Sequence, residues 1–401
     1  MLTSLALIFL LGLSMAAVCQ KLKFPYIIGM LLTGILLGPC VLNVLDPSIL
    51  AISSDLRQIA LIIILLKAGL SLDLSDLKKV GVSAVLMSCL PALFEILAFV
   101  LIAPSLLPVS RVEAAIMGAV LGAVSPAIVV PRMVRLMEEH YGVKKSIPQL
   151  IMAGASCDDV FVIVLFSTFV NMEQGNQVHL RDFLSIPVSI LSGILLGAVT
   201  GYFLSLFFET AFLKKHYIRN STKVIIISGL SFLLIAVEHW LEGIISVSGL
   251  LAVVSMACTL KIRCPGFVTR RLSEKFGKLW IAAEVILFVL VGAAVDIRYT
   301  LSAGAPAAVM ILLALVFRSA GVLCCLIKTG LNRKEKLFCI LSYLPKATVQ
   351  AAIGSVPLSM GLPCGKAVLS VAVLSILITA PVGAACMDLG YKKLLHHDAA
   401  K

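Results

Sequence analysis

The chain has 401 residues, of which 60% are hydrophobic and only 13% are charged. That charged share is about half of the roughly 25% that is typical of soluble domains. A soluble protein of this length would lack the polar surface to cover so many apolar side chains. Composition therefore excludes an ordinary soluble globular protein and indicates a membrane protein.

The apolar residues come in about thirteen long runs, each able to cross a hydrocarbon core of ~30 Å as a helix. We therefore predict an all-α membrane protein with about 13 transmembrane helices. The most basic polar stretch, 261–275, is predicted to be a solvated loop facing lipid headgroups. The runs lie near 2–18, 24–44, 56–72, 80–103, 112–131, 147–170, 183–208, 222–237, 243–260, 276–295, 304–327, 337–360 and 367–387.

The net charge of +12 is distributed unevenly between the two sets of connecting loops. If alternate loops are assigned to one side, that side and the C-terminus hold 25 of the 33 basic residues and the opposite side holds 5. Such an excess marks the cytoplasmic face. The sequence thus predicts a multi-pass protein of the cell (inner) membrane, with its N-terminus outside and its C-terminus cytoplasmic. The charge therefore gives no reason to expect a nucleic-acid partner, and membrane lipids are the expected surroundings.

Two groups of three runs share a pattern of buried charges and prolines. The first run of each group carries one charge, Glu95 or Arg318, and the second is interrupted by proline, at Pro126 and Pro131 or at Pro345. The loop charges orient the groups oppositely in the membrane. Inverted repeats with interrupted helices are typical of secondary transporters, whose substrate sites lie where the repeats meet.

Asp158 and Asp159 lie in the middle of the run 147–170. An ionised carboxylate at a helix centre costs about 2.5–3.5 kcal/mol on membrane-insertion scales, so two adjacent ones indicate function. Carboxylates provide the oxygen ligands that Na⁺ prefers, and they bind protons when the cation leaves. Competition of Na⁺ and H⁺ for Asp158 and Asp159 would produce exchange. Ser125 and Ser156 are further candidate ligands, and a structural hydrogen-bonded pair is the alternative interpretation.

The prolines indicate breaks in the helices on either side of this site. Ser125 to Pro131 forms one interrupted segment, because each proline removes a backbone donor and leaves a carbonyl that can line an ion path. In the matching run, Lys346 follows Pro345 and precedes Thr348. Its ammonium can neutralise the C-terminal end of a half-helix or pair with an aspartate. A simple proline kink and a lysine reaching the membrane interface are the alternatives.

Glu95 and Arg318 occupy corresponding helices of the two groups. A buried arginine needs a partner, so we predict that Arg318 pairs with Glu95, with Asp158 as the alternative partner. A structural role for this pair is as plausible as a functional one.

Three segments together resemble the monovalent cation/proton antiporter superfamily, in particular the NHA-like branch of sodium/proton exchangers. They are Gly154–Asp159, Ser125–Pro131 and Pro345–Ala352. The resemblance implies an elevator mechanism, in which a six-helix core moves against a scaffold that forms a homodimer. The implied parts are scaffold helices in 1–78 and 211–300, core helices in 79–172 and 301–390, a linker helix in 173–210 and a cytoplasmic tail in 391–401.

The resemblance also implies roles for individual residues. Asp159 would be the main carrier of cation and proton, with Asp158 assisting, and no cofactor would be needed beyond the transported Na⁺ or Li⁺ and H⁺. Many electrogenic members place a lysine on the helix that here carries Arg318. An arginine keeps its proton, which favours electroneutral exchange.

Other functions fit the sequence less well than sodium/proton antiport. A sodium-coupled symporter of an organic solute would have the same architecture but a more polar interior. A cation channel or a non-transporting subunit would not need inverted repeats. An enzyme is not expected, since the sequence contains no metal-binding histidine motif, no nucleophile paired with a base and no phosphate loop. The preference among Na⁺, Li⁺ and K⁺ is left open.

Overall fold

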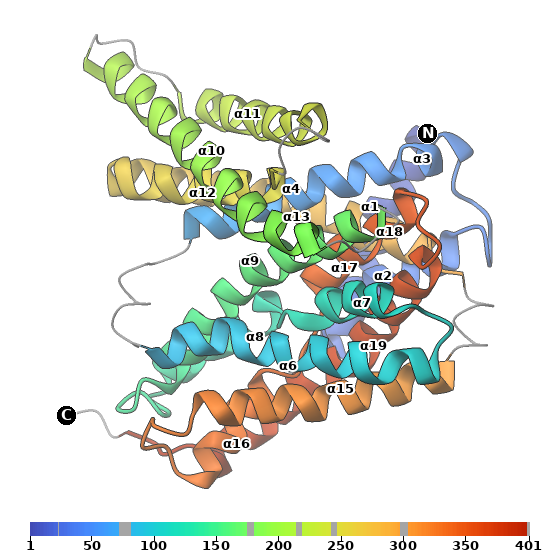
Figure 1. The fold of residues 1–401 in the computed structure, drawn as a ribbon, viewed down its shortest axis with the longest axis vertical. Coiled ribbons are helices and arrows are strands. Elements are labelled where there is room, and N and C mark those ends of the chain that lie inside the picture. The colour runs from blue at the N-terminus through green and yellow to red at the C-terminus, as the bar shows by residue number, and fades with distance from the viewer. Residues whose placement is uncertain are drawn as a thin grey trace. The chain divides into compact units, whose positions relative to one another are not determined.

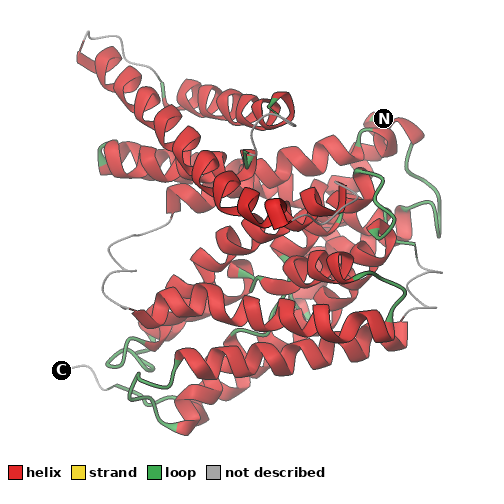
Figure 2. Cartoon of the chain, in the orientation of Figure 1, coloured by secondary structure: helices red, strands yellow, loops and turns green. Residues whose placement is uncertain are grey.

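The computed structural model describes residues 1–22, 24–71, 82–174, 180–213, 219–241, 247–296 and 304–398. The described residues form helices and loops without a named strand (Figure 2). The helices are α1 (Leu2–Lys21), α2 (Tyr26–Leu37), α3 (Pro47–Ala51), α4 (Ser53–Ser71), α6 (Val82–Leu106), α7 (Arg111–Gly122), α8 (Pro126–Glu138), α9 (Ile147–Gln174), α10 (Leu180–Leu213), α11 (Asn220–Trp240), α12 (Gly249–Arg263), α13 (Gly266–Ala293), α15 (Gly304–Cys325), α16 (Arg333–Ser342), α17 (Thr348–Gly354), α18 (Val356–Ser359) and α19 (Gly365–Leu394).

Within the described residues, each expected apolar run contains a helix or consecutive helices. Run 112–131 divides into α7 and α8, and run 337–360 into α16, α17 and α18. Among the described residues, eight segments are long and apolar enough to cross a membrane, one of them Arg111–Glu138 across the break between α7 and α8. The chain is thus an all-helical membrane protein, and the larger number of about 13 spans stays a prediction.

The prediction that 261–275 forms a loop is wrong. Only Cys264 and Pro265 separate α12 from α13, and the rest of the stretch is helical. The reason is an apolar stripe hidden by the surrounding charges: Val268, Leu272 and Phe276 recur every four residues and are buried. That spacing places them on one helix face, so the basic residues occupy the opposite face of an amphipathic helix.

The chain divides into two compact units. In the first unit, α6 packs along α15 and α7, and α19 contacts both α7 and α17 (Figure 1). In the second, α12 packs against α10 and α11. The first unit comprises Met1–Ser54, Asp73–Phe169 and Leu287–Lys401, and the second comprises Asp55–Leu72 and Val170–Ile286. All the residues expected to form the ion site belong to the first unit.

The chain after α19 pairs with the connection between α8 and α9. The amide of Gly142 donates to the carbonyl of His396 at 2.9 Å, and the amide of Asp398 donates to the carbonyl of His140 at 2.7 Å. Nearby, the guanidinium of Arg135 and the hydroxyl of Tyr391 hold the pKa of Glu139 below its usual range. These contacts tie the last described residues to the end of the helix pair that carries the interrupted segment.

Glycine allows α2 and the end of α13 to touch through their backbones. A Cβ atom at Gly34 would overlap the carbonyl oxygen of Val289, and one at Gly292 would overlap the carbonyl oxygen of Leu31. Small residues at helix interfaces permit this close approach in membranes.

Replacing Gly34 by alanine is therefore expected to destabilise the protein by about 1–3 kcal/mol, because backbone atoms must move to admit the methyl group. Thermal unfolding in detergent, followed by size-exclusion chromatography, measures the effect. Gly277→Ala in α13 is the matched control, since no described atom lies within 4 Å of its Cβ position. The control is expected to unfold at or above the wild-type temperature, and equal losses in both variants would contradict the packing argument.

Candidate functional site

The first interruption lies between α7 and α8. Helix α7 ends at Gly122, Ala123 and Ser125 have extended backbones, and α8 begins with Pro126 at its first position. The residue before a proline is disfavoured in helical conformation, whereas proline itself suits a first helical position. The unwound segment is thus 123–125, and the expectation of an interruption reaching from Ser125 to Pro131 is corrected. Pro131 lies inside α8.

The second interruption lies between α16 and α17 and packs against α19. Helix α16 ends at Ser342 and α17 begins at Thr348, with Pro345 and Lys346 in the unwound segment. The amide of Lys346 donates to the Thr379 hydroxyl at 3.0 Å. One turn further along α19, a Cβ atom at Gly383 would overlap the Pro345 ring. On α19, the Thr379 hydroxyl therefore binds this segment, and the missing side chain of Gly383 leaves room for the Pro345 ring.

The two interrupted segments meet, and each of the five residues from Leu121 to Ser125 has a main-chain group bound by a partner distant in sequence. The ammonium of Lys346 donates to the Leu121 carbonyl, and the guanidinium of Arg318 to the Gly122 carbonyl. The amide of Ser125 donates to the carbonyl of Pro345 at 2.9 Å. The side-chain amide of Gln350 donates to the Ala123 carbonyl at 2.8 Å, and the main-chain amide of Val124 donates to Asp158 Oδ2 at 2.8 Å. Backbone groups freed by the break are thus bound within the protein, as an apolar environment requires.

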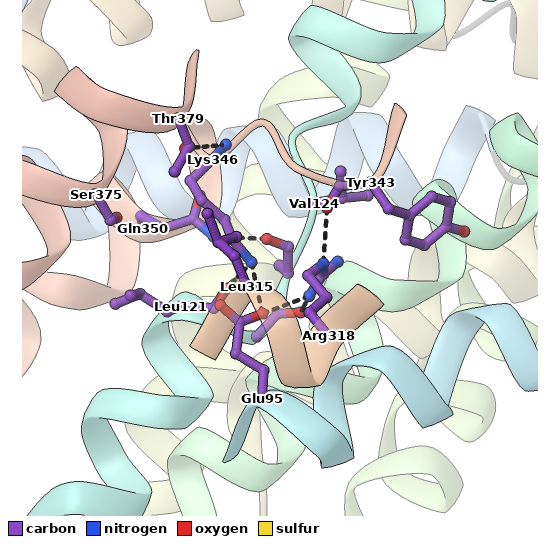
Figure 3. Close-up of polar contacts among 12 residues, drawn as sticks. Glu95, Leu121, Val124, Leu315, Arg318, Tyr343, Lys346, Gln350, Ser375 and Thr379 are labelled. Carbon is purple, nitrogen blue, oxygen red and sulfur yellow. Dashed lines mark hydrogen bonds and ion pairs between the residues drawn. The ribbon is translucent and has the colours of Figure 1, made fainter. Parts of the chain in front are cut away.

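Glu95 lies between the two buried cations (Figure 3). Its Oε2 atom is 2.7 Å from Arg318 Nη1 and 2.7 Å from Lys346 Nζ. The guanidinium extends further, with Nη2 3.1 Å from Asp158 Oδ2. The expected contact between Glu95 and Arg318 is therefore present, and so is the alternative contact with Asp158. If all four groups are ionised, two positive and two negative charges balance.

The two adjacent aspartates have different surroundings. Asp158 is 0% exposed and is bound by Arg318 and by the amide of Val124. Asp159 is 7% exposed, and its Oδ1 atom has no hydrogen-bond partner among the described residues. A charge that is neither paired nor hydrogen-bonded is costly to bury. Asp159 is therefore the carboxylate in this cluster for which a bound proton or cation would compensate.

Several other buried oxygens near the interruptions lack a hydrogen-bond partner among the described residues: Ser125 Oγ, Asp158 Oδ1 and Thr348 Oγ1. Ser125 follows Val124, whose amide holds Asp158, so this hydroxyl belongs to the same neighbourhood. An unpartnered buried oxygen calls for an explanation such as a bound water or ion, and oxygen ligands of this kind suit a hard cation. Ser156 lies in α9, but its side chain is outside the described residues.

The structure also reveals participants that the sequence did not single out. The main-chain groups of Leu121 to Val124 receive the charged side chains, and Tyr343 provides a carbonyl that accepts from Arg318 Nε at 2.7 Å. The signal available for the first group was Pro126, which marks carbonyls of the preceding turn that need new partners. No comparable signal marks Tyr343.

Interrupted helices that meet at a buried charge cluster are typical of secondary transporters. Its sequence matches the transmembrane sodium/hydrogen exchanger family over residues 5–387. The chain belongs to that family, whose members are transmembrane antiporters.

Particular relatives agree with this assignment. The chain is 34% identical to sodium/hydrogen exchanger 9B2 of Homo sapiens over 387 residues, which cover 92% of the chain and 70% of the relative. It is 34% identical to human sodium/hydrogen exchanger 9B1 over 371 residues, covering 87% and 68%. Its fold is similar to that of the sodium proton antiporter MjNhaP1 from Methanocaldococcus jannaschii, with a TM-score of 0.82, 22% identity and 98% of each chain covered.

The cluster predicts opposite effects on stability for two acidic residues. Glu95→Gln should destabilise the protein by about 3–5 kcal/mol, because it leaves Lys346 without its ion-pair partner in a buried place. Asp159→Asn breaks no ion pair of the described residues, so its unfolding temperature should equal or exceed that of the wild type. Thermal unfolding in detergent compares them, with Asp388→Asn, whose pair with Arg132 is partly exposed, as a control expected to change little. Equal destabilisation by Glu95→Gln and Asp159→Asn would contradict this account of the charges.

Proposed function

We propose that this protein exchanges Na⁺ or Li⁺ for H⁺ across the cell (inner) membrane, with cation and proton competing for Asp159 and with Asp158 assisting. The observation that carries the proposal is the difference between the two carboxylates. Each aspartate has one unpartnered oxygen, but Asp158 is held through its other oxygen by Arg318 and Val124, whereas Asp159 forms no ion pair among the described residues and lies next to a balanced set of charges. One site that must be neutralised by either ion is sufficient for antiport. Family membership and the similarity to sodium/hydrogen exchangers 9B1 and 9B2 support the same function.

The hydroxyls of Ser125 and Thr348 and, from its position in α9, Ser156 are proposed as further ligands of the cation. Pro126, at the start of α8, and Pro345, between α16 and α17, are proposed to support the site by interrupting the helical backbone on either side of it, and Pro131 lies inside α8 beyond it. Lys346 and Arg318 hold the carbonyl end of α7, so that cation binding does not have to offset the dipole of that half-helix. No cofactor is needed, because the transported ions themselves supply the charge compensation.

Exchange is proposed to be electroneutral. Arg318 keeps its proton throughout the cycle, and Lys346 and Arg318 together balance Glu95 and Asp158. Asp159 alone then changes its occupant, so one H⁺ leaves for each Na⁺ that binds.

The proposed mechanism is an elevator. Helices α6–α9 and α15–α19 would be the mobile core, formed by two inverted repeats. A scaffold of α1–α4 and α11–α13 would dimerise with a second copy, and α10 would link scaffold and core. All the site residues fall within the proposed core, and they belong to the first compact unit, which also includes Met1–Ser54 of the proposed scaffold. About 13 spans would place the N-terminus outside and the C-terminus in the cytoplasm.

A fluorescent protein fused after Lys401 should therefore mature and fluoresce in cells. If instead a reporter enzyme that is active only after export is active at the same position, the C-terminus lies outside and the proposed orientation is wrong.

Transport in proteoliposomes with an internal pH dye tests the exchange. Na⁺ or Li⁺ should dissipate a proton gradient through the wild type, and Asp159→Asn should reduce the rate by at least about tenfold, since removing the exchangeable charge removes a buried ion interaction worth more than about 1.4 kcal/mol. Asp388→Asn is the matched control and should transport like the wild type, because its carboxylate is paired with Arg132 outside the cluster.

In the same vesicles, a potassium gradient with valinomycin imposes a membrane potential. The initial exchange rate should not change with the potential if exchange is electroneutral, and a rate that follows the potential would show that net charge moves. Sodium uptake without proton movement would replace antiport by sodium-coupled symport of an organic solute. An active Asp159→Asn variant would refute the assignment of the carrier residue.

A further inference from the structure

We infer that Tyr343 is a positioning residue of the exchange site, which sets the place of Arg318 relative to the aspartates of α9. The inference rests on the proposed function, since it concerns how the same site is held. Tyr343 follows the last residue of α16 and is fully buried. Tyr343 contacts Arg318, whose guanidinium binds Asp158, and it also contacts α9, the helix that carries Asp158.

The contact with Arg318 has two parts. The Tyr343 carbonyl accepts a hydrogen bond from Arg318 Nε at 2.7 Å, and the centroid of the Tyr343 ring lies 5.6 Å from the guanidinium carbon. An arginine over an aromatic ring is attracted by the ring's electron distribution, most strongly where water is absent. The remaining guanidinium nitrogens reach Glu95, Gly122 and Asp158. Tyr343 therefore binds the Nε side of the guanidinium, while the guanidinium's two terminal nitrogens, Nη1 and Nη2, bind the other residues of the site.

The other end of Tyr343 bears on α9. A Cβ atom at Gly154 would overlap the Tyr343 hydroxyl oxygen, so the hydroxyl occupies the space left by the missing side chain. Gly154 precedes Asp158 by four residues, and residues four apart lie one turn apart on one helix face. The ring thus extends from the guanidinium to the turn of α9 just before the two aspartates.

Tyr343 binds Arg318, and Arg318 binds Asp158. Asp158 lies one turn along α9 from Gly154, which in turn contacts Tyr343. Moving Tyr343 must change either the distance between Arg318 and Asp158 or the place of α9. The Tyr343 hydroxyl has no hydrogen-bond partner among the described residues, and a buried unpaired hydroxyl costs free energy. Its role here is therefore that of a spacer against Gly154, and polar anchoring of the site comes from the carbonyl.

A steric suppressor experiment tests this role in the transport assay described above. Gly154→Ala should raise the apparent KM for Na⁺ by about threefold to tenfold in correctly folded protein, because the methyl group displaces a well-packed ring. Adding Tyr343→Phe removes the overlapping oxygen and leaves the ring carbon Cζ at 3.3 Å. The double variant should recover most of the loss. Recovery remains partial because Met87 Cβ also lies 2.9 Å from the new methyl group.

Gly118→Ala is the matched control for overpacking in general. Its Cβ would lie 2.8 Å from Ile96 Cα, in the contact between α7 and α6. None of the three atoms nearest to that Cβ belongs to Tyr343. Tyr343→Phe should not restore the transport that Gly118→Ala loses, although removing the unpaired hydroxyl should add some stability in either background. A purely structural effect would lower the amount of folded protein without changing the KM of the remainder, so KM and yield are measured together.

The inference is overturned if folded Gly154→Ala has the wild-type KM, if Tyr343→Phe fails to restore it, or if Tyr343→Phe equally improves Gly118→Ala. Should Gly154→Ala not fold, Tyr343→Leu decides the question without adding atoms to α9: it should raise the KM, and a wild-type KM would overturn the inference. Wild-type protein that exchanges no cation for protons refutes the proposed function itself, whereas active wild type with unresponsive variants refutes only the role of Tyr343.

Discussion

The need to satisfy the broken backbone at the end of α7 governs the rest of this structure. Unwinding 123–125 inside apolar surroundings exposes carbonyls and amides that neither water nor the helix can bind. Lys346, Arg318, Gln350 and Asp158 bind them instead. A single constraint on the backbone thus explains why two cations and a carboxylate are buried in a part of the chain where charge is otherwise rare.

Burying two cations creates a second requirement, which Glu95 meets. One carboxylate oxygen accepts from both Arg318 and Lys346 at 2.7 Å. With Asp158 taken by Arg318 and the Val124 amide, the structural charges balance. Asp159 is left outside this balance, and the proposed exchange of Na⁺ and H⁺ uses that remaining charge. In the proposed mechanism, structural support and transport chemistry are divided between these two adjacent side chains.

The division also accounts for the arrangement of the helices. Tight contacts at glycine, such as Gly154 against Tyr343 and Gly383 against Pro345, bring the interrupted segments and α9 close enough to share polar partners. The same small residues let helices in lipid approach where no hydrophobic effect drives them together. Membership of the sodium/hydrogen exchanger family and a fold similar to MjNhaP1 place this arrangement among antiporters.

The sequence by itself determined the features that depend on neighbouring residues. Apolar runs defined the helices, prolines 126 and 345 located the breaks, and the mid-membrane charges indicated the site, because each reports a local cost that must be compensated. It misjudged 261–275, where charges concealed an amphipathic stripe. The sequence also predicted that Arg318 pairs with Glu95, but only the tertiary structure decided that Lys346 meets the carbonyl of Leu121, 225 residues away. Helical periodicity fixes the face on which a side chain lies, but the crossing of distant segments selects its partner. That crossing brings Arg318 and the Val124 amide to Asp158.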